Sequence, residues 1–574
     1  MGIGNWNFTG NWLLEIFYFK MIAKITPLIR LPSTADVFDY FIPPDLEAGI
    51  KPGQLVSIPW RSSLERGVIL DIVPPPVPRR GLGGGQEGGF RARPIRKIID
   101  LIPVLTPAQL KLIKKFSEYY FCAPGAVARL VVPEMPVRRS GGVERNVGAV
   151  DFKIEKSQLA YLNQAAAGIK EASELEIKDI SSFIWLVFWF QKQYSSLVIL
   201  APTLHTLEAF GSVLIKKFGE SLAIIHSGLS RGAFWRAYQK ILHSQAKLIL
   251  ATRQGVFLPL PERSCILMFD SGSDDFKQYD QHPRYDARTV VKWAAELTAS
   301  RLIYTAPTFA LWPQAKPIIL PQASRVKTQI RLIDLKQTLG QKGFSIISEP
   351  ALEAISEAEN NKKKVVIISL REQGDDKVSV KRIKEVLTAE GKNVNDIIIS
   401  PPQILESGEL SSWRGKISSL IIASIEPLLA LPDYRSSERV FYRLKKWQML
   451  CEELLIPEML LQSYSPDNLA IRAFALGEEE QFVKSELDFR KELGYPPFVE
   501  LVKLSYKGND DKEFEKITSE LKLNVGIKIL GPYIEHRSKR KSLLLKLRDK
   551  IEIPLLYSLP SSQWVVDRDP ENVL

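Results

Sequence analysis

The sequence is poor in the residues that most often bind metals. It has three cysteines and five histidines among 574 residues. No two cysteines form a C-x-x-C pair, and no histidines show the H-E-x-x-H spacing. A zinc site is recognised by such close spacings, and a disulfide framework needs more cysteines than this. We therefore expect no structural metal and no disulfide framework.

Long apolar runs are missing as well. The longest, "FIWLVFWF" at residues 183–190, has eight residues, whereas a helix that crosses a bilayer needs about 20. A run of this length is typical of a buried strand or a short core helix. The N-terminus lacks the basic start and the small-residue cleavage site of a secretory signal. We expect a cytoplasmic protein with no membrane partner.

What the sequence does contain is an excess of positive charge. Lys and Arg number 77 and Asp and Glu number 65, which gives a net charge of +12. An excess of this size favours an anionic partner, either nucleic acid or a membrane surface. From charge alone, a basic surface that only faces solvent is the alternative.

The N-terminal part of the chain has the pattern of a small β-barrel. The segment that starts at Met21 is much more strand-like than residues 1–20, which we interpret as a non-native or disordered extension. Short runs rich in β-branched and aromatic residues then alternate with Pro and Gly, as far as about residue 101. "TPAQLKLIKKFSEYY" follows at 106–120, with a Thr N-cap and Pro at the first helical position, and predicts a helix.

The middle of the chain has the pattern of parallel sheets. Short apolar runs typical of buried parallel strands alternate with helical segments. A first series includes "LVIL" (197–200), "LAII" (222–225), "KLILAT" (247–252), "CILMFD" (265–270) and "RLIYTA" (301–306). A second series has "KVVIISL" (364–370), "DIIISP" (396–401) and "SLIIAS" (419–424). The sequence thus predicts two α/β lobes in tandem, followed by a region that mixes helix and strand.

Several of these stretches resemble one known family in the same order. "LVILAPTLHTL", "HSGLSRGAFWRAY", "ILATRQGVFLPL" and "FKQYDQHPRYDAR" are similar to segments of the first motor lobe of the primosomal replication-restart helicase, the PriA family. "LPDYRSSERVF", "LQSYSPDNLAI" and "ELGYPPF" resemble its second lobe and C-terminal region, and "VFDYFIPPDL" its N-terminal domain. Together they cover nearly everything from Met21 to the end.

The resemblance and the patterns predict a multidomain α/β fold. We expect a 3′-end DNA-binding β-barrel at 21–101, a winged-helix-like helical unit with a linker at 102–150, and two tandem helicase-like (RecA-like) α/β lobes. The lobes should span 151–322 and 323–475, and an α+β C-terminal DNA-binding domain should span 476–574.

The chain departs from the family where ATP would bind. A P-loop, G-x-x-x-x-G-K-[ST], cradles phosphates with backbone amides, a Lys and a hydroxyl. The family has it before "LVILAP", where this chain reads "IKDISSFIWLVFWFQKQYSS", with no glycine. The family's D-E-E-H becomes Asp270-Ser271-Gly272-Ser273, and a serine is no general base near neutral pH. We regard Asp270 as vestigial.

Other motor elements are also missing. The family's S-A-T motif reads "TAPT" at 305–308, and "KKWQMLCEEL" stands where a final arginine motif is expected. Such an arginine contributes roughly 10³–10⁵ in rate. The zinc-binding cysteines of the second lobe are absent. We expect no ATP, magnesium or zinc cofactor and no enzymatic activity.

Recognition of DNA could nevertheless survive. The family uses an F-D-Y triplet to grip the 3′ end of a strand, and Phe38, Asp39 and Tyr40 match it. Aromatic rings can stack on a base, and a carboxylate can accept a hydrogen bond from a 3′-hydroxyl. The alternative is that Phe38 and Tyr40 are two core residues of one strand face. Arg61 replaces the glycine of the family's "PFG" turn beside this site, and Arg96 matches a nearby basic residue.

Two further segments are candidates for nucleic-acid contacts. Thr252 and Arg253 match the family's "GTR" segment, which faces the DNA track; a capped strand end is the alternative. The run "RSKRKSLLLKLRDK" near the C-terminus could bind phosphates or could be a solvated face. Its candidate DNA-binding residues are Arg537, Lys539, Arg540 and Lys541.

The sequence therefore predicts a DNA-binding protein of replication restart without ATPase activity. Its expected partners are forked or single-stranded DNA with a 3′ end, replication-restart proteins and single-strand-binding proteins, and its expected place is the cytoplasm, with the nucleoid. One alternative is an active ATP-dependent 3′–5′ helicase with unusual motifs. A second is a structural protein whose DNA surfaces have decayed.

Overall fold

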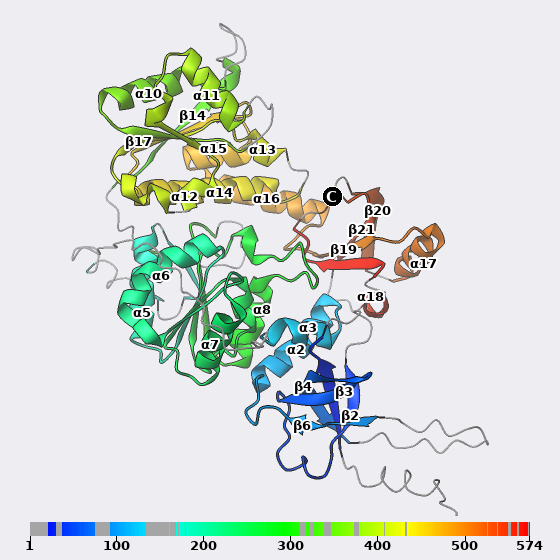
Figure 1. The fold of residues 1–574 in the computed structure, drawn as a ribbon. Helices are drawn as coiled ribbons and strands as arrows, with labels where there is room; N and C mark the ends of the chain where they lie inside the picture. Colours follow the sequence, from blue (N-terminus) through cyan, green and yellow to red (C-terminus); the bar gives the residue numbers. More distant parts are fainter. Residues whose placement is uncertain are drawn as a thin grey trace, which may run out of the picture.

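The computed structural model contains four β-sheets within the part of the chain that it describes. The barrel lies at one end of the molecule, the second parallel sheet at the other, and the C-terminal domain beside both lobes (Figure 1). The described residues are 21–29, 37–74, 92–133, 160, 168–169, 172–177, 179–309, 317–320, 326–337, 346–371, 378–406, 408–430, 433–524, 526–535, 538–548, 553–559, 562–571 and 573. The extension at 1–20 and Arg537 lie outside them.

The N-terminal sheet has six strands in the order β5-β2-β1-β4-β3-β6. Its strands are β1 (Ile22–Pro27), β2 (Phe38–Phe41), β3 (Leu55–Trp60), β4 (Ser63–Val73), β5 (Arg93–Pro94) and β6 (Lys97–Ile98). One short segment supplies both outer strands, because β5 pairs with β2 and β6 pairs with β3. The sheet therefore curls on itself, and its inner face holds a core of aliphatic residues and Tyr40.

Two helices follow the barrel, α2 (Pro107–Tyr120) and α3 (Pro124–Val131). The predicted start of α2 is confirmed: the Thr106 side chain and the Gln109 side chain cap each other's backbone amides. The described residues 102–133 hold this helix pair and no strand, and the rest of the unit predicted to be winged-helix-like, 134–150, lies outside the described residues. Phe116 of α2 contacts Phe257 and Tyr285, so the helix pair packs on the following lobe.

The next sheet, which we call lobe 1 with its helices (residues 172–320), has seven parallel strands in the order β13-β7-β12-β11-β8-β10-β9. Its strands are β7 (Glu174–Glu176), β8 (Leu197–Leu200), β9 (Leu222–Ile225), β10 (Leu248–Ala251), β11 (Cys265–Met268), β12 (Arg301–Ala306) and β13 (Ile318–Ile319). Its helices are α5 (Ile180–Gln191), α6 (Leu204–Phe218), α7 (Arg231–Leu242) and α8 (Ala287–Leu297). The apolar run at 183–190 is thus a core helix, one of its two expected states.

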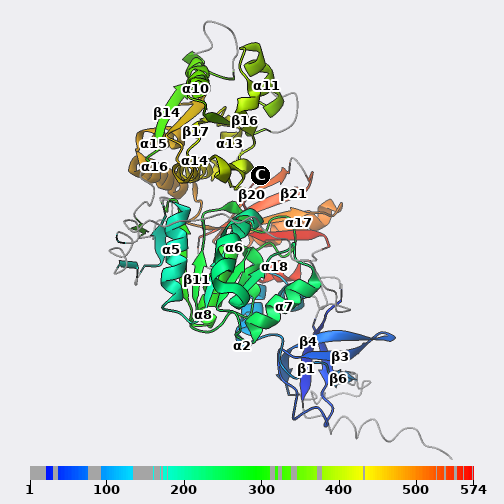
Figure 2. The same cartoon turned by 60° about the vertical axis from the view of Figure 1, so that its left-hand side comes forward.

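Lobe 2 (residues 326–493) has a five-stranded parallel sheet in the order β14-β18-β17-β15-β16. Its strands are β14 (Gln329–Asp334), β15 (Lys364–Ile368), β16 (Ile397–Ser400), β17 (Ile417–Ile422) and β18 (Glu458–Ser463). Its helices are α10 (Glu349–Asn360), α11 (Val380–Ala389), α12 (Gln403–Glu406), α13 (Glu426–Leu429), α14 (Ser436–Glu453), α15 (Leu469–Leu476) and α16 (Glu479–Leu493). The long helix α14 runs along the side that faces lobe 1 (Figures 1 and 2).

The C-terminal domain has an antiparallel sheet in the order β20-β21-β19-β22. Its elements are β19 (Glu500–Tyr506), α17 (Asp511–Lys522), β20 (Ile527–Ile534), β21 (Lys541–Leu547), α18 (Pro554–Ser558) and β22 (Trp564–Arg568). It docks on the end of α2, where the Arg568 guanidinium lies 3.8 Å from the centre of the Tyr119 ring. The expected mixed α/β class is confirmed. Within the described residues, no helix is both long and apolar enough to cross a membrane.

Candidate functional sites

The first site is the start of α5, where a P-loop would hold phosphates. Only three residues, 177 to 179, join β7 to α5, whereas the P-loop motif spans eight positions. Asp179 caps the helix: one of its carboxylate oxygens accepts hydrogen bonds from the Ser182 amide (2.7 Å) and the Ser182 hydroxyl (2.8 Å). The helix start therefore already carries a negative charge of its own.

A second carboxylate reaches the same helix start from lobe 2. Glu453, at the end of α14, accepts a hydrogen bond from the Ile180 amide at 3.2 Å. Burial and the charge of Asp179 raise the pKa of Glu453 to about 7. Asp179 and the partly ionised Glu453 thus take amides of this helix start, which leaves fewer donors for a phosphate group and places negative charge beside them.

The second part of this site is Asp270, which follows β11 in a left-handed conformation with φ of 54°. One of its oxygens accepts a hydrogen bond from the Tyr442 hydroxyl at 2.5 Å, and the other lies 2.7 Å from the Lys446 ammonium. Lys446 also pairs with Glu406 at 2.9 Å. Burial raises the pKa of Asp270, and Lys446 opposes that shift. An ammonium group thus occupies the side of Asp270 where the family resemblance implies magnesium.

Lys446, the partner of Asp270, and Glu453, the partner of the α5 start, come from one segment of lobe 2. "KKWQMLCEEL", which replaces the expected arginine motif, contains Lys446 and Glu453 on α14. Tyr442 and Arg439, one and two turns earlier on α14, also contact lobe 1. The Tyr442 hydroxyl accepts a hydrogen bond from the Gly272 amide at 3.1 Å, and a Cβ added at Gly272 would lie 2.2 Å from the Tyr442 ring.

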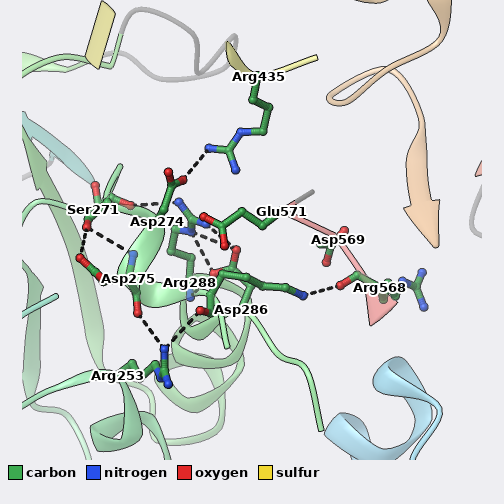
Figure 3. Close-up of polar contacts among 12 residues, drawn as sticks. Arg253, Ser271, Asp274, Asp275, Asp286, Arg288, Arg435, Arg568, Asp569 and Glu571 are labelled. Atoms are coloured by element: carbon green, nitrogen blue, oxygen red, sulfur yellow. Dashed lines mark hydrogen bonds and ion pairs between the residues drawn. The ribbon is translucent and has the colours of Figure 1, made fainter. Parts of the chain in front are cut away.

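Ion pairs extend this contact between the lobes (Figure 3). Asp274 of lobe 1 lies 3.1 Å from Arg439 and 3.6 Å from Arg435. Thr308, the last residue of "TAPT", donates a hydrogen bond to Glu479 of α16 at 2.9 Å. These contacts join the facing surfaces of lobe 1 and lobe 2. The two surfaces would have to separate before a nucleotide could enter between them.

The residues present therefore do not fit a magnesium-nucleotide complex. They do not fit a zinc site either, since Cys122, Cys265 and Cys451 are buried on separate elements. Burial raises the pKa of Cys265 to about 12, which disfavours the thiolate that binds metals.

The second site is a pocket of about 360 Å³ on the barrel. Its size lies within the roughly 300–1,000 Å³ range of small-ligand sites. The structure brings four of the predicted residues together here, Phe38, Asp39, Tyr40 and Arg61, while Arg96 is not part of the lining. The remaining lining residues are Pro59, Trp60, Ala92 and Arg93.

The aromatic residues of this pocket are held by the barrel itself. Tyr40 is 4% exposed and belongs to the barrel core, and its hydroxyl donates to the Pro59 carbonyl at 3.3 Å. Phe38 packs edge-to-face on Trp60, with 4.8 Å between ring centres. The alternative core role of these residues is therefore real, and the same rings also line the pocket.

Arg93 is a pocket residue that the sequence motifs did not indicate. It follows a long Gly-rich stretch, and only the pairing of β5 with β2 places it opposite Tyr40. Its guanidinium donates to the Arg61 carbonyl at 3.0 Å. The sequence gives one signal for this role: Arg93 is a basic residue shortly before the last strand of the barrel, β6.

The remaining candidates lie apart from both sites. Thr252 precedes a short 3₁₀ segment, Arg253–Phe257, and makes no side-chain cap to it. Arg253 donates to the carbonyls of Asp275 and Lys277 at 3.3 and 3.2 Å (Figure 3). This arginine supports the loop after β11, and a role in DNA contact stays a prediction.

The C-terminal basic run divides into exposed and paired residues. Lys539 is exposed and Arg540 is half-buried. Lys541 forms an ion pair with Asp511. Lys546 of the same run is buried, with its ammonium 3.5 Å from the centre of the Tyr495 ring and 2.9 Å from the Leu493 carbonyl. Fewer charges are open to a phosphate than the sequence alone indicates.

Comparison with known proteins points to one group. Residues 28–133, which include the pocket, match the family model described as 3′DNA-binding domain (3′BD). The chain is 22% identical over 93% of its length to "Replication restart protein PriA" of Rickettsia conorii, covering 93% of that protein. It is also 22% identical, over 64% of the chain, to the protein of that name from Synechocystis, but there the match spans only 56% of the relative's length.

Solved structures add little. A Mycobacterium smegmatis helicase Lhr bound to single-stranded DNA and AMP-PNP covers 57% of this chain with a TM-score of 0.33, and the match spans 50% of that protein. RecG bound to a three-way DNA junction covers 59% with a TM-score of 0.34, over 47% of that chain. Both are 9% identical to this chain, and likeness at this level bears on neither fold nor function.

Proposed function

Because the chain belongs to the family of the replication restart protein PriA, we propose that it is a DNA-binding protein of replication restart that does not hydrolyse ATP. Its DNA would be forked or single-stranded, with a 3′ end held in the barrel pocket. It would act as a scaffold for replication-restart proteins and single-strand-binding proteins.

The observation that carries the DNA-binding part is the pocket inside the matched 3′DNA-binding domain. Phe38 and Trp60 are half-buried, so part of each ring can stack on an unpaired base. Arg61 and Arg93 are exposed at the same pocket and can pair with phosphate oxygens. Stacking together with cationic contacts is how proteins hold single strands without reading a sequence.

The contacts between the lobes support the absence of ATP hydrolysis. Catalysis of phosphoryl transfer needs a phosphate cradle, a metal and a group that orients water. Here, Asp179 and Glu453 take the helix-start amides, and Lys446 and Tyr442 take the oxygens of Asp270. Replacing these partners would require the lobes to separate and to leave several buried charges unpaired, which is costly.

The end-binding part can be tested by equilibrium binding of the full chain. Three DNAs of one sequence should be compared: a fork with a free 3′ end in the leading strand, the same fork without that strand, and a closed circular single strand. We expect the first to bind most tightly. Binding of none of them at low salt would contradict the proposal and favour a structural protein.

The ATP part can be tested by phosphate release in the presence of the preferred fork. We expect release at the level of a no-protein control. Turnover above that level that disappears in Asp270→Ala would contradict the proposal and identify an active helicase with unusual motifs. The matched control is Glu262→Ala, an exposed acid of lobe 1 that lies outside the contact between the lobes.

A further inference from the structure

The last residues of the chain lie where the C-terminal domain meets lobe 1 and lobe 2. We call residues 567–571 and 573 the C-terminal tail. Arg568, Asp569 and Glu571 of this tail lie beside the part of lobe 1 that carries Asp274 (Figure 3). Different residues of the tail make its contacts to lobe 1, to lobe 2 and to the C-terminal domain itself.

The contact of the tail with lobe 1 is a buried ion pair. The two carboxylate oxygens of Asp567 lie 2.8 Å from the Lys277 ammonium and 3.1 Å from the Arg284 guanidinium. The Lys277 ammonium also donates a hydrogen bond to the Arg568 carbonyl at 2.7 Å. The side chains of Lys277 and Asp567 are 2% and 6% exposed. Such a pair is costly to break, because each partner would be left as an unpaired charge.

The contact of the tail with lobe 2 is made by Arg439 of α14. Its guanidinium donates a hydrogen bond to the Glu571 carbonyl at 2.6 Å. The same guanidinium lies 3.1 Å from Asp274 of lobe 1 and 2.6 Å from Asp433 of lobe 2. One arginine therefore joins lobe 1, lobe 2 and the tail.

The tail is fixed on both sides of Glu571. Before it, the Tyr119 hydroxyl of α2 donates a hydrogen bond to the Asp569 carboxylate at 3.1 Å. After it, Val573 is buried in an apolar cluster of the C-terminal domain, and its carbonyl accepts a hydrogen bond from the Tyr533 hydroxyl at 2.5 Å. Glu571 is thus held within reach of Arg439 by contacts that do not involve lobe 2.

These contacts form a closed ring. Asp274 of lobe 1 pairs with Arg439, and Arg439 holds Glu571. Asp567 of the same tail returns to lobe 1 at Lys277, whose amide donates a hydrogen bond to the Asp274 carbonyl at 3.0 Å. If the C-terminal domain moved away from lobe 1, it would therefore also take Glu571 away from Arg439.

We propose that the C-terminal tail is a clasp that holds lobe 1 and lobe 2 together, so that the position of the C-terminal domain controls whether the lobes are closed. Asp567 fixes the clasp to lobe 1, and the Glu571 carbonyl fixes it to lobe 2. A ligand that moved the C-terminal domain off lobe 1 would open the lobes, and opening the lobes would loosen the C-terminal domain by the same free energy. The clasp needs neither nucleotide nor DNA, so it does not depend on the proposed function.

The test is hydrogen exchange of the full chain, read by mass spectrometry at two amides that are bonded to the other lobe. The Ile180 amide donates to Glu453 at 3.2 Å and the Gly272 amide to Tyr442 at 3.1 Å, so both become open to exchange when the lobes separate. A chain that ends at Asp569 lacks the contact between the tail and lobe 2. Both amides should exchange about tenfold faster in it than in the full chain.

A second variant keeps the full length. Asp567→Asn preserves the shape of the side chain but removes the charge that pairs with Lys277 and Arg284, and it should speed exchange at the same two amides. Glu515→Gln neutralises an exposed acid of the same domain and is the matched control. It should exchange as the unmodified chain.

The amides of β10, in the core of lobe 1, show whether an effect is local. Faster exchange at Ile180 and Gly272 with unchanged exchange in β10 would support the clasp. Unchanged exchange at the two amides in either folded variant would overturn the inference, because the lobes would then stay closed without the clasp. Equally faster exchange in β10 of the Asp567→Asn chain would also overturn it, since the tail would then support the whole fold. If the shortened chain does not fold, Asp567→Asn decides by the same criteria.

Discussion

The contact between the lobes and the barrel pocket are the two places where the family resemblance implies a ligand, and their charges are arranged in opposite ways. Between the lobes, Asp270 has Lys446 and the α5 amides have Asp179 and Glu453, so each charge is used by a protein partner. In the pocket, Arg61 and Arg93 are exposed beside a cavity. A site binds a ligand more readily when its polar groups are not yet satisfied by the fold, and for this reason we propose the pocket, and not the contact between the lobes, as the ligand site of the two.

The largest expected effect is at Lys446, and it tests whether the contact between the lobes is a structural unit. Lys446→Met should leave Asp270 as a buried acid without its cation and the half-buried Glu406 without its partner. Removing one partner of a buried ion pair costs about 3–5 kcal/mol, so the midpoint of thermal unfolding should fall strongly in calorimetry.

The matched control is Lys115→Met, because Lys115 pairs with Glu296 at 2.9 Å on the exposed surface. Such pairs contribute about 0–1 kcal/mol. If the two variants unfold at the same temperature, the contact between the lobes is not a structural unit.

The next effect is a pH dependence at Glu453. Its pKa of about 7 in the folded chain is raised above the usual value of about 4.3. The stability linked to its protonation is therefore fully present below about pH 4.3 and is lost as the pH rises through 7. Glu453→Gln should stabilise the chain by about 2–3 kcal/mol at pH 8 and have little effect at pH 4.

Thermal unfolding of the Glu453→Gln variant at both pH values checks this prediction. Glu220→Gln changes an exposed acid of lobe 1 and serves as the control. A Gln variant that is equally stabilising at both pH values would mean that the effect does not follow the protonation of Glu453, and it would contradict the raised pKa.

A smaller effect is expected in the pocket, at Phe38. Phe38→Ala removes a ring that can stack on a base, a contact that contributes about 1–3 kcal/mol. The affinity for a 3′-ended strand should fall accordingly in anisotropy, while the affinity for a closed circle should change little. Leu101→Ala, an exposed apolar residue of the same domain (75% exposed), is the control. Equal losses for the linear and circular strands would show that Phe38 has only a structural role.

The smallest effect is expected in the C-terminal basic run. Each phosphate contact on a single strand contributes about 0.7 to the slope of log affinity against log salt. Arg540→Ala should lower this slope by about that amount, whereas Lys541→Ala should lower it less, because Lys541 is already paired with Asp511. Equal changes in the two variants would show that this ion pair breaks on binding.

Regular elements were predictable where local pattern and burial agree. The run "LVIL" is β8 and "LAII" is β9, with the predicted bounds. These strands are nearly all buried, so a continuous apolar run is a reliable signal. The helix after Thr106 was predictable because its cap is formed by residues within one turn.

The partners that decide function were not predictable in this way. Motif reasoning found that the P-loop glycines and the second acid after Asp270 are missing. It did not show that Glu453 accepts a hydrogen bond from the start of α5 or that Lys446 pairs with Asp270, since both residues are far away in sequence. Arg93 was missed for the same reason: it reaches the pocket only through the pairing of β5 with β2. Side-chain pairs of this kind depend on the register of strands and the packing of helices.

The most direct test of the account is titration calorimetry of the full chain with Mg–ATP, before and after saturation with a 3′-ended fork. The account predicts no binding heat with the nucleotide in either state and clear binding of the fork. Mg–ATP binding that is lost in Asp270→Ala and kept in Glu262→Ala would contradict it, because the nucleotide would then occupy the surface that Lys446 and Glu453 hold closed.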